Sequence, residues 1–155
     1  MERLAVSPDD DAPSLGPRVS YDELHFASGV IRQPERSNSM DIASNTWPDS
    51  LDALVAAANH HTLLMENDRV RVIQTLIPPG DTVPVHTHRW PAVMHILSWS
   101  DFIRRDEHGK TLLDTRGQAP PAEGAILWAE PLPPHSVENA GSSTIRIIGI
   151  ELKTP

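Results

Sequence analysis

Short β-type runs separated by turn signals fill the chain from His61 onward, and this alternation constrains the fold more than any other feature. With 15 prolines and 8 glycines in 155 residues, the composition favours rigid turns over long helices. No helical period lies between the runs, so about eight strands predict an all-β sandwich or barrel. The predicted strands are residues 62–66, 69–77, 83–88, 92–105, 111–115, 125–129, 135–138 and 144–152.

The chain before these strands divides into two parts. Residues 1–45 are rich in Pro, Ser, Asp and Asn with scattered apolar positions, which predicts an extended arm without a core of its own. Apolar side chains then recur at helical spacing over residues 51–58, behind Pro48, and predict one helix. The expected organisation is an N-terminal arm, 1–45, followed by a β-barrel domain, 46–155.

Charge and composition exclude several classes of function. The formal net charge of -8 repels a phosphate backbone, and no dense Lys/Arg cluster offsets it, so nucleic acid is not an expected partner. The absence of cysteine rules out disulfides, thiolate ligands and a cysteine nucleophile. The first residues lack a secretory signal pattern, and no apolar run approaches membrane-spanning length. We therefore expect a cytoplasmic protein without a membrane partner.

Two histidines stand two residues apart after the turn Pro78-Pro79-Gly80. Alternate side chains of a strand point to the same face, so His86 and His88 lie about 7 Å apart along the backbone and can converge on one ion. A His-x-His pair alone also fits two surface residues on an edge strand. The surrounding sequence is needed to choose between a metal site and a pair of surface residues.

Two segments around these histidines resemble the paired motifs of the cupin superfamily. The first motif is Gly-x5-His-x-His, and the second ends in a histidine followed by an asparagine four residues later. The matching positions are Gly80, His86 and His88 in the first segment and Gly124, His135 and Asn139 in the second. The resemblance covers about residues 60–152 and implies a small antiparallel β-barrel of jelly-roll type that holds a divalent metal. The implied ligands are His86, His88 and His135.

The first motif lacks its carboxylate ligand. That position falls on Ala92 or on Val93, depending on the loop length, and neither side chain binds metal. In the Ala92 register, which the position of Trp99 favours, His95 points outward. In the Val93 register His95 points into the barrel and becomes a candidate fourth ligand or substrate contact.

Other polar and aromatic residues have ordinary explanations beside the functional ones. Trp90 and Trp128 flank the motifs and are candidates for a pocket wall, although tryptophan in a small barrel is more often core. Asn139 is a further candidate pocket residue. Solvated surface positions account for the hairpin end at residues 104–107 and for the remaining histidines. These histidines are His25, His60, His61 and His108.

Three neutral imidazoles leave a divalent ion its full charge and two or three open positions, which favours an anionic chelating ligand. The three-His dioxygenases of the cupin superfamily, which act on small thiols or β-diketones, use Fe(II) in such a set. The resemblance therefore implies an Fe(II) dioxygenase, with Zn, Ni or Mn as other candidate metals. The alternative is a non-catalytic ligand-binding or regulatory cupin whose metal site is degenerate or structural.

The predicted arm bears on assembly. An arm without its own core, beside a small barrel with strand edges to cover, is expected to pack across a neighbouring subunit. The expected contacts are Tyr21, Phe26 and Ile31. We therefore expect a homodimer.

Overall fold

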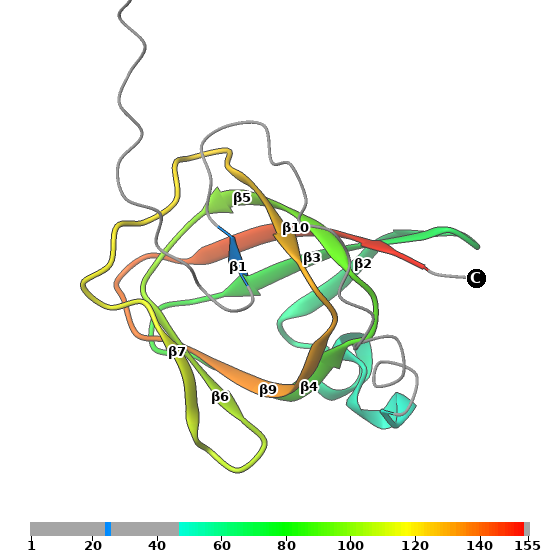
Figure 1. Ribbon diagram of the computed structural model, residues 1–155, viewed down its shortest axis with the longest axis horizontal. Coiled ribbons are helices and arrows are strands. Elements are labelled where there is room, and N and C mark those ends of the chain that lie inside the picture. The colour runs from blue at the N-terminus through cyan, green and yellow to red at the C-terminus, as the bar shows by residue number, and fades with distance from the viewer. Residues whose placement is uncertain (1–23, 26–46, 154–155) are drawn as a thin grey trace, which may run out of the picture.

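A computed structural model describes residues 24–25 and 47–153, which form an antiparallel β-barrel of two facing sheets (Figure 1). The six-stranded sheet has the order β1-β8-β5-β10-β3-β2, and the four-stranded sheet has the order β4-β9-β6-β7. The strands are β1 (Leu24–His25), β2 (His61–Glu66), β3 (Val70–Ile77), β4 (Thr82–His88), β5 (Ala92–Ser98), β6 (Phe102–Asp106), β7 (Thr111–Asp114), β8 (Ile126–Ala129), β9 (Leu132–Asn139) and β10 (Ile145–Leu152). The prediction of an all-β, jelly-roll barrel is confirmed.

The segment before the barrel is less helical than the sequence predicts. Asp49–Leu51 forms a 3-10 turn, η1, and Ala53–Ala56 forms a single α-helical turn, α1, with Asp52 in an extended conformation between them. The Asp52 carboxylate accepts a hydrogen bond from the backbone N–H of Leu54 at 3.0 Å, as an N-cap residue does. The expected helix is split because this aspartate starts a new turn instead of continuing the first.

Two predicted strands differ from the observed ones by more than one residue at a boundary. The run 92–105 forms two strands, β5 and β6, which belong to different sheets. β9 begins earlier than predicted and contains Pro133 and Pro134. Proline has no N–H to donate to a ladder, and the pairing of β9 with β4 is irregular around these positions. The ladder therefore accommodates the prolines by shifting its register.

Both motif glycines lie in turns that need them. Gly80 precedes β4 with φ of 79°, and Gly124 precedes β8 with φ of 73°. Residues with a side chain rarely adopt such positive φ values, whereas glycine does so without steric cost. The two turns begin the segments that carry the motif histidines.

An apolar core fills the space between the sheets. Its buried cluster consists of Ala57, Ile77, Val83, Phe102, Ala129 and Ile145, against which Met94, Trp99, Leu113, Val137 and Ile147 pack. The rings of Trp99 and Phe102 meet edge to face at 5.3 Å between centroids. Most of these side chains also line an internal cavity, so the core and the cavity are continuous.

The predicted arm is described only at β1, which pairs with β8 of the same chain and forms one edge of the six-stranded sheet. The expected intersubunit contacts, Tyr21, Phe26 and Ile31, lie outside the described residues. The boundary at residues 45 and 46 stays a prediction. Within residues 24–25 and 47–153, no helix is long and apolar enough to cross a membrane.

Candidate metal centre

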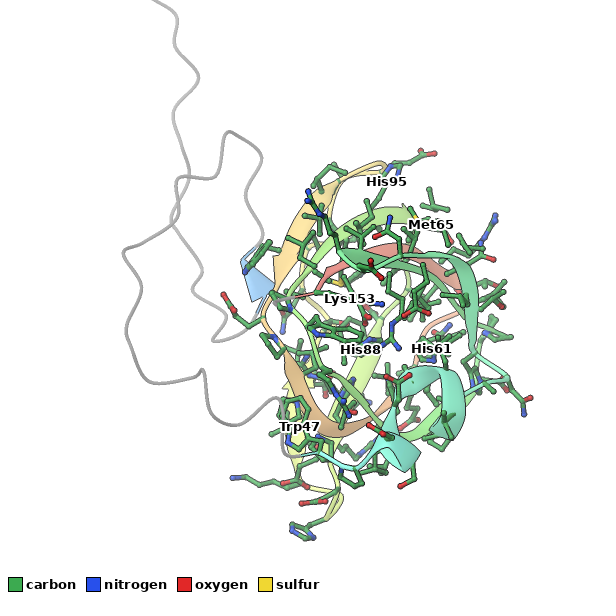
Figure 2. The ribbon with its side chains drawn as sticks, turned by 90° about the vertical axis from the view of Figure 1, so that its right-hand side faces the viewer. Trp47, His61, Met65, His88, His95 and Lys153 are labelled. Carbon is green, nitrogen blue, oxygen red and sulfur yellow. The ribbon has the colours of Figure 1, made fainter. Side chains whose placement is uncertain are left out.

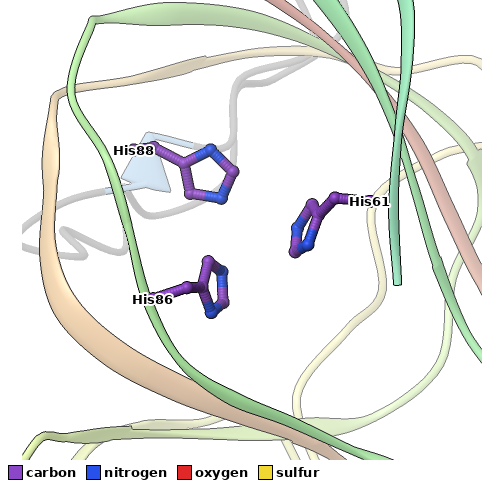
Figure 3. A group of neighbouring side chains, drawn as sticks. All are labelled: His61, His86 and His88. Atoms are coloured by element: carbon purple, nitrogen blue, oxygen red, sulfur yellow. The ribbon is translucent and has the colours of Figure 1, made fainter. Parts of the chain in front are cut away.

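Four imidazoles gather in the barrel interior. His86 and His88 lie on β4, His135 lies opposite His86 on β9, and His61 begins β2 across the barrel. The ring centroids are 4.3 Å apart for His86–His135, 4.8 Å for His61–His86, 5.1 Å for His86–His88, 5.3 Å for His61–His88 and 5.9 Å for His88–His135. One ring nitrogen from each of His61, His86 and His88 lies within 4.8 Å of the others (Figure 3). The structure thus brings the rings of the three expected ligands together and adds His61, but the group whose nitrogens converge is His61, His86 and His88, without His135.

Local sequence orients His86 and His135. Each follows a proline by two residues, and its Nδ1 lies against the carbonyl oxygen of that proline, at 2.8 Å from Pro84 and 2.7 Å from Pro133. A carbonyl oxygen only accepts hydrogen bonds, so Nδ1 must carry the proton. The same short pattern, Pro-x-His, therefore turns both rings so that Nε2 is left for another partner.

His61 and His88 find their partners on other elements. Nδ1 of His61 lies 3.2 Å from the carbonyl oxygen of Ala57, just after α1. Nδ1 of His88 lies 2.8 Å from Oε1 of Glu151 on β10. All four rings are therefore held through Nδ1, which is how ligating histidines are commonly oriented by their surroundings.

Burial keeps His61, His86 and His135 neutral. Desolvation, together with repulsion from His88 and His86, lowers the pKa of His61 to about 2. Desolvation and repulsion from His88 lower the pKa of His86 to about 3, and burial also lowers the pKa of His135 well below its usual value. A histidine must be unprotonated to bind a metal, so these rings are ready for an ion at neutral pH.

The donor set fits a divalent transition metal. Neutral imidazole suits Zn, Cu, Fe and Ni. In a tetrahedral site with bond lengths of about 2.0–2.1 Å, two ligand nitrogens lie about 3.3 Å apart. The nitrogens of His61, His86 and His88 lie within 4.8 Å of one another, so the widest pair needs to close by about 1.5 Å. Side-chain rotations of this size would let these residues hold an ion.

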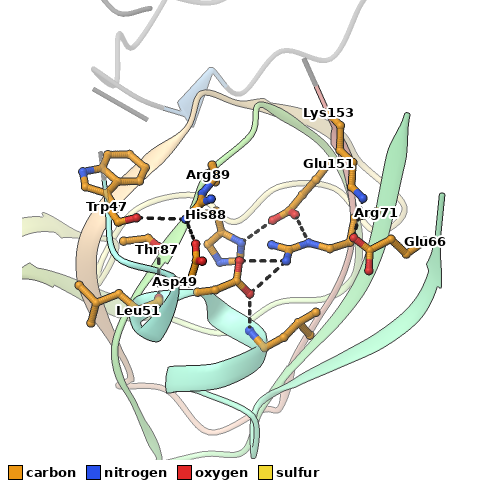
Figure 4. Close-up of polar contacts among 12 residues, drawn as sticks. Trp47, Asp49, Leu51, Glu66, Arg71, Thr87, His88, Arg89, Glu151 and Lys153 are labelled. Atoms are coloured by element: carbon orange, nitrogen blue, oxygen red, sulfur yellow. Dashed lines mark hydrogen bonds and ion pairs between the residues drawn. The ribbon is translucent and has the colours of Figure 1, made fainter. Parts of the chain in front are cut away.

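A chain of buried charged side chains is hydrogen-bonded to the ring of His88 (Figure 4). Arg71 donates from Nε to Oε2 of Glu151 at 2.6 Å, and from Nη1 to both carboxylate oxygens of Asp52 at 3.0 and 2.9 Å. Burial alone would raise the pKa of Glu151, but the hydrogen bonds from His88 and Arg71 outweigh it and the pKa is lowered. Glu151 is therefore a buried carboxylate in its charged form. The sequence analysis did not single it out.

The imidazoles border a cavity of about 120 Å³ with largely apolar walls. Trp90 lines this cavity, and its ring centre lies 4.7 Å from Cζ of Arg71, within the range of a cation–π contact. Arg104 on β6 also lines the cavity and is 6% exposed. The prediction of a solvated hairpin end at 104–107 is therefore wrong for Arg104. Strand alternation turns it inward with Phe102.

The structure places His95 away from the cavity lining. β5 presents Ala92 and Met94 to the cavity, which corresponds to the Ala92 register. Nε2 of His95 lies 3.9 Å from the point that a Cβ on Gly124 would occupy. Figure 2 shows His95 at the periphery of the barrel, whereas His61 and His88 lie within it.

The other two candidate pocket residues also lie apart from the cavity. Trp128 pairs across from β1, and its Nε1 donates to Glu130 at 2.8 Å. Asn139 is 1% exposed, and its side-chain amide donates to the carbonyl oxygens of Ile77 and Ser143 at 2.8 Å each. Asn139 therefore ties the end of β9 to neighbouring segments.

The prediction that His61 is a solvated surface residue is wrong. His60 lies in the turn before β2, and its side chain is 12% exposed, so it is not a solvated surface residue either. His61 is 4% exposed and joins the cluster, while Nε2 of His60 lies 3.5 Å from Asp81. The sequence signal for the inward position is weak, because alternation does not say which of two neighbours faces the interior.

Solved structures share the fold of this barrel, although the sequence itself has no match among known families. No protein-family model matches the chain, and no curated protein matches it. Its structural neighbours are cupin-domain proteins. A cupin domain from Bordetella pertussis Tohama I is 21% identical, with 61% of this chain and 92% of that chain covered and a TM-score of 0.49.

Two further neighbours are more distant in sequence. A cupin superfamily protein from Desulfitobacterium hafniense is 15% identical, with 61% of this chain and 76% of that chain covered and a TM-score of 0.41. An RmlC-like cupin with a double-stranded β-helix fold from Methanocaldococcus jannaschii is 14% identical, with 59% and 77% covered and a TM-score of 0.43. The account of the histidine cluster rests on the side chains of this chain alone.

Proposed function

We propose that the chain is a metal-dependent enzyme of the cupin type, an Fe(II) dioxygenase for a small anionic chelating substrate. The observation that carries the proposal is the cluster of four imidazoles, each held through Nδ1, which leaves Nε2 of each ring for an ion. His86, His88 and His135 are the proposed ligands. His61 is the proposed fourth, in place of the carboxylate that the first motif lacks. Zn, Ni and Mn are the alternative metals.

The residues around the cluster favour a small anion. Uncharged ligands leave the charge of a divalent ion uncompensated, and the Arg104 guanidinium adds positive charge to the cavity wall. The cavity of about 120 Å³ suits a small molecule rather than a drug-sized ligand. An Fe(II) ion held by three of these imidazoles would supply open coordination positions for O2 and for two atoms of the substrate, and binding of His61 as a fourth ligand would leave one position fewer. The apolar wall excludes water and strengthens electrostatic attraction inside the cavity.

One feature also fits a non-catalytic alternative. Glu151 lines the cavity beside His88, but both of its carboxylate oxygens accept hydrogen bonds. It is therefore not available as a general base. In an enzyme, the metal and the bound substrate would have to carry the chemistry; in a ligand-binding or regulatory protein, no general base is needed.

Metal content and O2 consumption distinguish the proposed enzyme from the non-catalytic alternative. Protein expressed in media supplemented with Fe, Zn, Ni or Mn is expected to contain close to one metal ion per chain, and a variant with alanine at His86 much less. Fe(II)-loaded protein is expected to consume O2 with a member of a panel of small thiols and β-diketones. Metal-free protein of unchanged stability, with no O2 consumption after loading, would support the non-catalytic alternative.

We also propose a homodimer, supported by an exposed apolar edge. β2 ends the six-stranded sheet, and Leu63, Leu64 and Met65 on it are 44%, 51% and 47% exposed. An apolar edge strand left open invites pairing with another chain, so a stable protein covers it. The arm of a second copy of the chain, residues 1–45, is the proposed cover.

A further inference from the structure

His88 differs from the other three histidines in what holds its ring. The Nδ1 atoms of His61, His86 and His135 lie against backbone carbonyl oxygens, which can only accept a hydrogen bond. Nδ1 of His88 lies against a side chain, the carboxylate of Glu151, at 2.8 Å. The position of the proton on His88 is therefore controlled by a group that a single substitution can change.

Glu151 has no freedom to choose another partner. It is 1% exposed, and its second oxygen accepts from Nε of Arg71 at 2.6 Å. Arg71, 5% exposed, is anchored in turn by the two oxygens of Asp52. Each oxygen of Glu151 thus faces a donor, and the carboxylate can serve both donors because both of its oxygens are acceptors.

We propose that Glu151, anchored by Arg71 and Asp52, is a positioning residue that keeps the proton of His88 on Nδ1 and so keeps Nε2 free to bind a metal ion. This inference rests on the proposed metal site. Glu151 does not contact the ion in this arrangement; it acts through the imidazole. The carboxylate also makes the ring a better electron donor, as carboxylates behind ligating histidines generally do.

An amide in place of the carboxylate exposes this role. Glutamine offers one oxygen and one NH2 group, so it cannot accept from both Arg71 and His88. If its oxygen stays with the charged guanidinium, its NH2 group faces Nδ1 of His88. The ring then has to accept at Nδ1 and carry its proton on Nε2, and a protonated Nε2 cannot bind metal. A wrong tautomer of this kind disables a histidine without moving it.

Hydrogen bonds also connect the cluster of four histidines to the segment before the barrel, which includes Asp52. Asp52 caps α1 through Leu54, and Ala57, at the end of α1, accepts from Nδ1 of His61. Thr87, next to His88, donates from Oγ1 to the Leu51 carbonyl oxygen at 3.1 Å. The segment from residue 51 to residue 57 therefore helps to orient two of the four imidazoles.

Two measurements on Glu151→Gln test the proposal. Nitrogen-15 NMR of the metal-free protein reports which ring nitrogen of His88 carries the proton, and it does not depend on activity or on metal. The wild type is expected to show the proton on Nδ1 and the variant to show it on Nε2. Competition with a coloured chelator for Co(II) is expected to show affinity lowered about 10- to 100-fold, with an altered visible spectrum of the Co(II) protein.

Glu138→Gln is the matched control. Glu138 pairs with Arg105 at 2.8 Å on the outside of the barrel, so this change removes an ion pair but should leave the His88 tautomer and the Co(II) affinity unchanged. Asp52→Asn, which keeps an N-capping side chain, covers the case in which Glu151→Gln does not fold. It is expected to lower Co(II) affinity in the same direction but by less.

Some results would overturn the proposal. A proton on Nε2 of His88 in the metal-free wild type would do so, whether or not any variant folds. Wild-type Co(II) affinity and an unchanged tautomer in a folded Glu151→Gln protein would reduce Glu151 to a structural role. If the wild type binds no metal, the proposed function fails, but the NMR measurement still decides whether Glu151 sets the tautomer.

Discussion

Acidification should destabilise the metal-free protein well above the pH at which carboxylates titrate. His61, His86 and His135 are 4%, 2% and 3% exposed, and burial lowers the pKa of each far below the usual histidine value of 6.5. In the unfolded chain these histidines recover that value. Between about pH 6.5 and pH 3 the unfolded state therefore binds more protons than the folded state, so stability falls as the pH falls.

The size of the effect follows from the number of buried rings. A histidine that titrates at pH 6.5 when unfolded and stays neutral when folded contributes a loss of about 1.3 kcal/mol between pH 7 and pH 5.5. Three such residues give about 4 kcal/mol, against a total stability of about 5–15 kcal/mol for a typical domain. Glu151 adds little in this window, because its pKa is lowered from 4.5 and the carboxylate is charged in both states.

Urea unfolding of the metal-free protein at pH 7 and pH 5.5 measures this loss. His108 is exposed, with 83% of its side chain accessible, so His108→Gln should leave the difference unchanged. His86→Gln removes one of the three buried rings and should reduce the difference to about two thirds. Equal unfolding free energies at the two pH values, or a more stable protein at pH 5.5, would refute the reasoning.

Four further outcomes are expected. His88→Ala should lower metal affinity at least tenfold with little change in the urea midpoint, because the apolar core does not depend on the ion; a variant that unfolds under native conditions would show the metal to be structural. Arg104→Met should weaken binding of a small carboxylate to the metal-loaded protein about tenfold by calorimetry, and an unchanged affinity would remove Arg104 from substrate binding. Gly80→Ala should cost about 1 kcal/mol in thermal unfolding because φ is 79°, whereas Gly149→Ala, whose Cβ would meet its nearest atom at 3.9 Å, should cost much less. Light scattering should show a dimer for the full chain and a monomer after deletion of residues 1–45; a monomeric full chain contradicts the dimer, and a dimer that survives the deletion assigns it to the barrel.

The features that the sequence predicts well are those determined by residues close together in the chain. Strand alternation puts His86 and His88 on one face, and the motif spacing brings His135 to them; the structure has all three in one cluster. Turn chemistry correctly marks Gly80. The His86–His88 pair and the turn at Gly80 need only the period of a strand and the backbone freedom of glycine, whereas Gly124 and His135 are identified through the resemblance to the cupin motifs.

The features that sequence misses depend on partners far along the chain. Arg71 and Glu151 are 80 residues apart and read as surface charges, because charged residues are almost never fully buried unless paired. Arg104 begins a run of charged residues in which Arg105 and Asp106 are partly buried and Glu107 is exposed. The inward position of His61 could be predicted only from the place of the whole strand β2, which pairs with β3 and lies in a different sheet from β4. Contacts between strands that are far apart in the sequence determine the buried position of each of these residues. A single sequence does not reveal such contacts.

The place of Glu151 on β10 has a consequence for how the protein is made. Synthesis proceeds from the N-terminus, and β10 is made after the other described strands, yet it inserts between β3 and β5 in the larger sheet. His86 and His135 take their orientation from carbonyl groups two residues away, so they are arranged as soon as their strands form. The ring of His88 cannot meet Glu151 until β10 inserts. Under the proposed function, a nascent chain would therefore hold an incomplete set of ligands, and tight metal loading would have to follow the insertion of β10.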